Sequence, residues 1–125
     1  PALVREGRFE QADSYQAASA LLDLPEPPTA IFAASDMSAF GAAEAIRQRG
    51  LRIPEDISLV GFDDIPEAAY MHPALTTVRQ PLYDMGRLAA RMLVQAIAAG
   101  ELPADRMVVP THLIIRQSCQ PPRHG

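Results

Sequence analysis

Two short apolar runs separated by an amphipathic segment constrain the fold of this chain more than any other feature. Residues 29–34 and 57–62 are almost entirely apolar and too short for buried helices, which is typical of strands covered on both faces of a parallel sheet. Between them, Met37, Phe40 and Ala43 recur at helical spacing. Strand–helix–strand alternation with short connections predicts βαβ units, and therefore an α/β fold with a parallel sheet.

Further elements follow from periodicity and from the residues that interrupt it. Apolar residues at spacings of three and four predict helices over residues 11–22 and 82–99. The second helix has one broad apolar face, and Gly100 ends this helix. We expect the remaining extended segments at four places: residues 3–5, 75–78, 107–109 and 113–115.

Composition limits the kinds of function that this chain performs by itself. Its 125 residues are about one domain's worth, and 48% of them are hydrophobic, which is enough for a packed core. A net charge of −4 argues against a nucleic-acid-binding module. The single cysteine, Cys119, excludes an internal disulfide and leaves no ligand set for a structural zinc. No apolar run is long enough for a membrane span, so we expect no membrane partner.

Polar residues follow both predicted buried strands and mark a candidate site. Ser35 and Asp36 follow the first strand, and Asp63 follows the second. Parallel sheets bind ligands in the crevice at the carboxyl ends of their strands. An ionised carboxylate accepts two hydrogen bonds at once, which suits adjacent sugar hydroxyls, so Asp63 is the principal candidate; its alternative role is to cap the turn.

The residues give little support to an enzyme or a metal site. Asp63 and Asp64 suggest a magnesium site, but no GxxxxGK phosphate loop accompanies them, and adjacent strand residues point to opposite faces. His72, His112 and His124 share no metal-ligand spacing, and no serine lies in a GxSxG motif. We therefore predict no catalytic residue, no metal and no cofactor. A hydrolase that uses the two aspartates is a much weaker hypothesis than a ligand-binding function.

Several ordered motifs together resemble the LacI/GalR family of transcriptional regulators. The resemblance covers essentially the whole chain, and the motifs that carry it are residues 29–36 (TAIFAASD), 41–43 (GAA), 49–64 (RGLRIPEDISLVGFDD), 73–81 (PALTTVRQP) and 115–119 (IRQSC). It implies the C-terminal part of an effector-binding core with the periplasmic-binding-protein-like type I fold. The DNA-binding headpiece would lie upstream of Pro1.

The resemblance also implies how the chain is organised. Residues 1–119 would form the core portion, with crossings to an absent subdomain between about residues 79 and 112. Residues 120–125 are polar and proline-rich, and by composition we expect them to form a flexible tail. The helix over residues 82–99 would normally pack on the absent subdomain. In this chain we expect that helix to expose its apolar face, and to rearrange, swap or self-associate.

Site residues carry over to the positions that match the family's motifs. Asp63 matches the aspartate that contacts the effector. Ser35 stands where many relatives carry Asn, and its alternative role is a helix N-cap. Phe9 matches an aromatic residue that stacks on the effector, with a core aromatic as the alternative. Gln80, at the crossing, would reach into the cleft.

The family's dimerisation face implies a surface for a second copy of the chain. Its candidate residues are Phe40, Gly41, Glu44 and Gln48 on one helix stripe, with Tyr70 and Met71 from residues 69–71 beside them. The alternative is that Phe40 belongs to the core and that Glu44 and Gln48 form a solvated edge.

Two function classes remain from this reading. The first is the effector-sensing and dimerisation part of a cytoplasmic, LacI-type regulator, in which a sugar-like ligand modulates operator affinity through the upstream headpiece. The second is a sugar-binding protein of a transport system with the same fold. A helix-turn-helix or a secretory signal peptide in the upstream sequence would discriminate between them.

Overall fold

The protein forms a four-stranded mixed sheet with helices on one face and a long helix extending from one end. The computed structural model describes residues 2–102 and 106–122. The elements, in chain order, are α1 (Gln11–Leu22), β1 (Ala30–Phe32), α2 (Asp36–Gln48), β2 (Ser58–Asp63), the 3₁₀ helix η1 (Pro66–Ala69), β3 (Thr76–Arg79), α3 (Leu82–Ala99) and β4 (His112–Ile114). The predicted α/β class is confirmed.

The sheet has the order β1-β2-β3-β4 and is parallel over its first three strands. Ile31 aligns with Leu59, and Gly61 aligns with Thr77, so the inward-facing residues of neighbouring strands share one face. β4 joins β3 in the antiparallel sense, with His112 opposite Arg79. The carboxyl ends of β1, β2 and β3 therefore lie at one edge, as the βαβ pattern predicts.

Two of the predicted strands do not form. At residues 3–5, the carbonyl groups of Ala2 and Val4 accept hydrogen bonds from the side chain of Arg5 instead of from a neighbouring strand. Residues 107–109 return from α3 outside the four-stranded sheet. In both cases the apolar pattern is present but the ladder partner is missing, and a strand needs that partner to satisfy its backbone groups.

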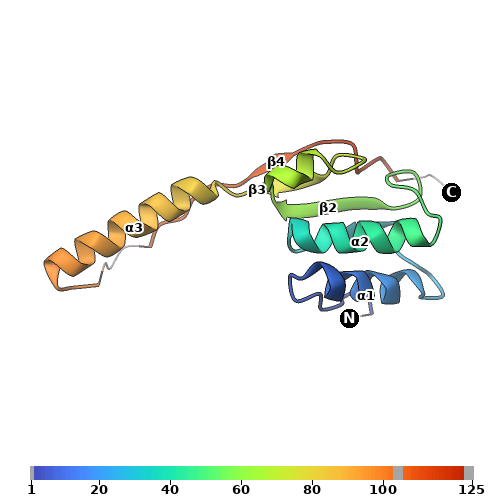
Figure 1. Cartoon of the computed structure of the whole chain (residues 1–125), viewed down its shortest axis with the longest axis horizontal. Coiled ribbons are helices and arrows are strands. Elements are labelled where there is room, and N and C mark those ends of the chain that lie inside the picture. Colours follow the sequence, from blue (N-terminus) through green and yellow to red (C-terminus); the bar gives the residue numbers. More distant parts are fainter. Residues whose placement is uncertain (1, 103–105, 123–125) are drawn as a thin grey trace.

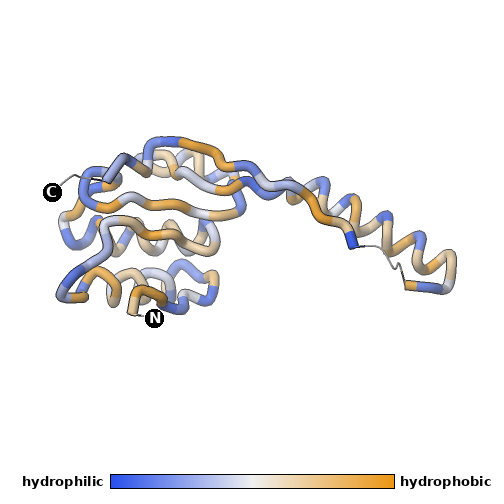
Figure 2. The backbone as a smooth tube through the Cα atoms, turned by 180° about the vertical axis from the view of Figure 1, so that it is seen from behind, coloured by the Kyte–Doolittle hydropathy of each residue, from blue (hydrophilic) through white to orange (hydrophobic). Residues whose placement is uncertain are grey.

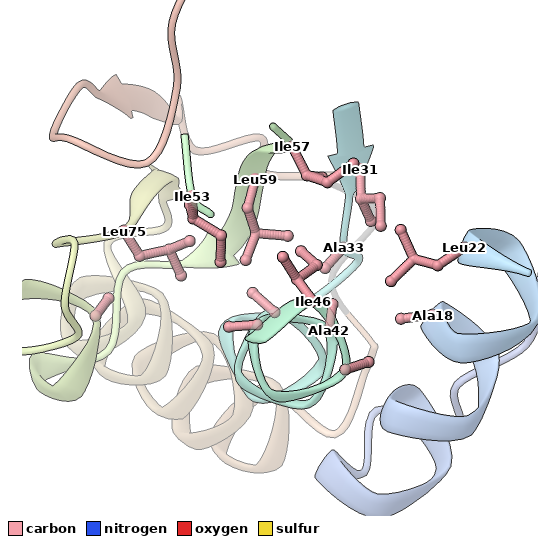
Figure 3. Packing of buried hydrophobic residues seen from close by; sticks show 14 residues of the cluster. Ala18, Leu22, Ile31, Ala33, Ala42, Ile46, Ile53, Ile57, Leu59 and Leu75 are labelled. Atoms are coloured by element: carbon pink, nitrogen blue, oxygen red, sulfur yellow. The ribbon is translucent and has the colours of Figure 1, made fainter. Parts of the chain in front are cut away.

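The core lies between the sheet and the helix pair α1–α2 (Figure 3). α1 runs alongside α2, and Ala18 and Leu22 of α1 point towards Ile31 on β1. The two helices approach closely at Gly41, where an added Cβ would lie 2.2 Å from the Gln11 carbonyl oxygen. Small residues on α2 thus bring α1 close enough to complete the core.

α3 extends away from this body on the two segments that lead to and from it (Figure 1). It has no buried residue, and the side chain of Ile97 is 73% exposed. Orange and blue positions alternate along α3 in Figure 2, as expected for an amphipathic helix without a partner. The predicted exposure of this apolar face is confirmed, whereas self-association stays a prediction.

The C-terminal segment is attached to the sheet further along than its composition suggests. Gln120, the first residue of the predicted tail, donates from its backbone to Ser58 Oγ at 3.2 Å and from its side chain to the Glu55 carbonyl at 3.0 Å. Pro121 and Pro122 are exposed, and residues 123–125 lie outside the described residues. Within the described ranges, no helix has the length and apolar character that a membrane span requires.

Candidate functional site at the carboxyl edge of the sheet

Asp63 ends β2 and is held by a residue of the first crossing. Gln80 Nε2 donates a hydrogen bond to Asp63 Oδ1 at 2.6 Å, and the Gln80 amide donates to the Asp63 carbonyl at 3.2 Å. Asp63 is half-buried and has a φ of +117°, followed by +61° at Asp64. Left-handed conformations at two successive non-glycine residues cost free energy and persist only where the surroundings enforce them.

The edge that carries Asp63 also carries the starts of both packed helices. In Figure 1, α1 and α2 begin at the same end of the body at which β2 ends, and the arm bearing α3 leaves from that end. Ser35 caps α2: its Oγ accepts from the Ser38 amide at 3.1 Å and donates to Ser38 Oγ at 3.1 Å. The capping role is therefore present, and a ligand contact by Ser35 stays a prediction.

Asp36 lies beneath the site and supports it from within. Its side chain is fully buried; Oδ1 accepts from Thr77 Oγ1 at 2.6 Å, and Oδ2 accepts from the Ile65 amide at 2.8 Å. Burial raises the pKa of Asp36, the charge of Asp63 adds to the rise, and the hydrogen bonds from Thr77 and Ile65 oppose it. Asp36 thus joins α2, β3 and the turn after Asp63.

Asp64 points to a different set of partners from Asp63. Arg79 Nε donates to Asp64 Oδ2 at 2.6 Å, and Arg116 Nη2 forms an ion pair with Oδ1 at 2.7 Å without the alignment of a regular hydrogen bond. Burial of the Asp64 carboxyl disfavours its charge, but the hydrogen bonds and charges of the two arginines outweigh burial and lower its pKa. Asp63 is therefore the member of the pair whose carboxylate is without an arginine partner among the described contacts.

Phe9 lies in a separate apolar hollow. Its side chain is 66% exposed, its φ is +59°, and it lines a cavity of about 460 Å³ between the N-terminal segment, α1 and β1. Neither Asp63 nor Gln80 lines this cavity. The structure therefore brings Asp63 and Gln80 into direct contact but shows no contact between Phe9 and that pair, and stacking on an effector stays a prediction for Phe9.

The predicted dimer surface is partly exposed. Tyr70, Glu44 and Gln48 are exposed, and the half-buried Phe40 and Met71 pack against the core. Gly41 is buried beneath α1 of the same chain, so it is not available to a second copy in this arrangement.

The stripe containing Gln48 also contacts its own chain. Gln48 Oε1 accepts a hydrogen bond from the Tyr15 hydroxyl at 2.6 Å, which attaches this end of α2 to α1. A dimer role for Phe40, Glu44, Gln48, Tyr70 and Met71 stays a prediction. Within residues 2–102 and 106–122, no group of three or more His, Cys, Asp or Glu side chains is placed to hold a metal ion.

The sequence analysis does not single out four residues that support the site: Gly61, Thr77, Arg79 and Arg116. Gly61 lets Asp36 approach, because a Cβ there would lie 2.3 Å from Asp36 Oδ1. Arg79 contacts Asp64 from the end of β3, whereas Arg116 contacts it only after the chain has passed through the whole α3 arm. The motifs that resemble the LacI/GalR family contain all four residues, but their pairing has no local signal in the sequence.

Comparison with known proteins identifies the domain to which this edge belongs. The family model described as "Periplasmic binding protein-like domain" matches residues 1–119. The chain belongs to this family. Membership of this family accounts for the fold of the chain.

Relatives of this periplasmic-binding-protein-like chain include transcriptional regulators. The chain is 38% identical over 118 residues to the HTH-type transcriptional repressor CytR of Escherichia coli K12, covering 94% of this chain and 35% of the relative. A LacI family regulator from Enterococcus faecium with bound ribose has a TM-score of 0.83 at 33% identity, covering 92% and 42% of the two chains. A dimeric Lac repressor has a TM-score of 0.82 at 30% identity, covering 90% and 41%.

These relatives confirm the resemblance to LacI-type regulators that the motifs indicate. The chain spans about a third of the length of the curated relatives that it matches.

Proposed function

We propose that this chain is the C-terminal, effector-binding and dimerisation part of a LacI-type transcriptional regulator, and that Asp63 binds the effector. The observation that carries the proposal is the position of Asp63 at the carboxyl end of β2, half-buried and bonded to Gln80. Gln80 is also the residue at which the chain starts its crossing to α3. A ligand on Asp63 therefore contacts the point at which the two parts of the molecule join.

The chemistry of this edge suits a polyol. Gln80 uses one oxygen of Asp63, and the carboxylate retains acceptor capacity on the other for a ligand hydroxyl. A carboxylate–hydroxyl hydrogen bond is charge-assisted and therefore stronger than one between neutral groups. The ribose held by the Enterococcus regulator supports a sugar or sugar derivative as the effector class that we propose here.

The remaining parts of the proposal concern the whole protein. Operator DNA would be bound by an upstream headpiece, as the helix-turn-helix in the name of the CytR relative suggests, and the protein would act in the cytoplasm. A homodimer would form through the surface around Phe40 and Tyr70, in line with the dimeric Lac repressor. The relatives are regulators, and we propose no enzymatic activity for this chain.

The test uses the protein at the length that its gene encodes. A thermal-shift panel of pentoses, hexoses and nucleosides identifies a ligand, and a gel-shift assay then measures operator binding with and without it. We expect Asp63→Ala to abolish the response to that ligand while operator binding in its absence stays intact. A ligand response unchanged by Asp63→Ala, or no ligand in the panel, contradicts the proposal.

A further inference from the structure

One buried carboxylate, that of Asp64, pairs with a residue of β3, the strand that leads to α3, and with a residue just after β4, the strand by which the chain returns. Its partner Arg79 is the last residue of β3, shortly before α3 begins, and its partner Arg116 follows β4, by which the chain returns. The side chain of Asp64 is only 5% exposed. A single acidic group thus links the strand that leads to α3 with the segment that follows the returning strand.

The turn that contains Asp64 is fixed at each of three successive residues. Gln80 binds Asp63, the two arginines bind Asp64, and the Asp36 carboxylate accepts from the amide of Ile65. The left-handed backbone at residues 63 and 64 depends on such contacts, because neither residue is a glycine. Removing the contacts of Asp64 would therefore release the middle of the turn that presents Asp63.

Arg116 is itself anchored, so its ion pair places the turn at a definite position on the sheet. Its Nη1 donates to the Leu75 carbonyl at 2.9 Å, and its amide donates to Thr76 Oγ1 at 3.0 Å. Arg79 is 53% exposed and lies opposite His112 of β4. Without the negative charge of Asp64, the guanidinium groups of Arg79 and Arg116 would lose the counter-charge that they share.

We propose that Asp64 is a positioning residue, which, through Arg79 and Arg116, fixes the Asp63 turn relative to the two segments that carry α3. This inference rests on the proposed function in that Asp63 binds the effector. A movement of α3 then shifts the Asp63 turn through the paired strands. Conversely, ordering of the Asp63 turn limits the movement of α3. A role confined to stability would lower the melting temperature without loosening the turn and the arm base together.

The decisive experiment needs no ligand. Hydrogen–deuterium exchange is measured on the protein at its natural length, as wild type, as Asp64→Asn and as Asp84→Asn. Asp84 is the matched control, because it forms an exposed ion pair with Arg87 inside α3. We expect Asp64→Asn to raise exchange about tenfold at residues 63–66 and 79–82 together, whereas Asp84→Asn leaves both segments unchanged.

A second variant covers the case in which Asp64→Asn does not fold. Arg79→Gln removes one ion pair at a half-exposed position and leaves Asp64 paired with Arg116, so a smaller rise in the same two segments is expected. If both variants fold, exchange at residues 63–66 that stays at the wild-type level in both overturns the inference. If only Arg79→Gln folds, wild-type exchange at residues 63–66 in that variant overturns it. A rise at the turn without one at residues 79–82 also overturns it.

Ribose titration separates this inference from the proposed function. If wild type binds ribose, Asp64→Asn should weaken binding about tenfold with Asp63 still in place, and unchanged affinity overturns the positioning role. If no sugar or nucleoside binds wild type, the proposed function fails, while the ligand-free exchange comparison still decides whether Asp64 couples the turn to the arm.

Discussion

The Asp36 carboxylate occupies the space over Gly61 that any larger residue would need. An added Cβ at Gly61 would lie 2.3 Å from Asp36 Oδ1 and 2.8 Å from Leu75 Cδ2. Asp36 cannot move away without losing its bonds to Thr77 and Ile65, which hold β3 and the Asp63 turn. Because Gly61 on β2 has no side chain, the Asp36 carboxylate has room to hold β3 and the Asp63 turn beneath the candidate site.

Gly61→Ala should lower the free energy of unfolding by about 1–3 kcal/mol, as overpacking of a buried site typically does. Gly86→Ala is the control, since Gly86 lies in α3 and has nothing within 4 Å of an added Cβ. Alanine there should be neutral or stabilise the helix by up to about 1 kcal/mol. Chemical unfolding of both variants measures the difference, and equal effects would contradict the packing described at Gly61.

The ion pairs of Asp64 predict a stability difference that depends on pH. Because the folded-state pKa of Asp64 is lowered, its contribution is complete above the unfolded value of 3.8 and is lost as pH falls through the folded pKa. Near neutral pH, the free energy of unfolding of wild type should be about 2 kcal/mol larger than that of Asp64→Asn. This difference in free energy should disappear in acid.

Urea unfolding of wild type and Asp64→Asn at a series of pH values measures this gap. The pKa of Asp36 is raised, so its effect has the opposite sign: stability falls as pH rises from 3.8 through the folded pKa of Asp36. Asp36 is present in both proteins, and subtraction therefore isolates Asp64. A gap that stays constant down to the lowest pH would assign the effect of the substitution to packing instead of charge.

The exposed apolar face of α3 predicts association of the 125-residue chain. Leu93, Val94 and Ile97 are each more than half exposed, and contiguous exposed apolar surface favours contact with another copy. Ile97→Glu should shift the chain towards the monomer in sedimentation velocity, and Gln95→Glu, which adds the same charge at an exposed polar position, should not. A wild-type chain that sediments as a monomer at all concentrations would contradict this prediction.

The surface around Phe40 predicts a dimer of the protein at its natural length. Phe40→Glu should weaken dimerisation at least about tenfold, because it places a charge in an apolar contact. Met37→Glu, at an exposed position on the same helix, is the control. Sedimentation equilibrium measures the dissociation constant, and thermal unfolding checks folding. An unaltered constant for Phe40→Glu would assign this half-buried side chain to the core alone.

The helices α1 and α3 were predictable from the sequence because their signals are local. α1 and α3 match the predicted ranges of residues 11–22 and 82–99, where apolar spacing is regular and Pro81 and Gly100 mark the ends of α3. The predicted strands at residues 3–5 and 107–109 failed for a non-local reason: an extended segment needs a neighbour, and composition does not say where that neighbour is.

The candidate site shows the same division. The strand-end rule predicts Asp63 at the carboxyl edge of the sheet, where the structure shows it at the end of β2 and bonded to Gln80. The pairing of Asp64 with Arg79 and Arg116 has no local signal in the sequence, and Arg116 returns to the site only after α3. The sequence does not decide between a cap and a ligand contact for Ser35, since one hydroxyl serves either role; the structure shows the cap.

Isothermal titration of Asp63→Asn with the sugar or nucleoside that wild type binds tests the central claim most directly. Asparagine keeps the size of the side chain and replaces the charge, and Asp84→Asn serves as the control for a lost surface charge. The account predicts that Asp63→Asn loses at least about tenfold in affinity with its melting temperature preserved, while Asp84→Asn binds as wild type does. Wild-type affinity in Asp63→Asn would contradict the assignment of Asp63 as the group that binds the effector.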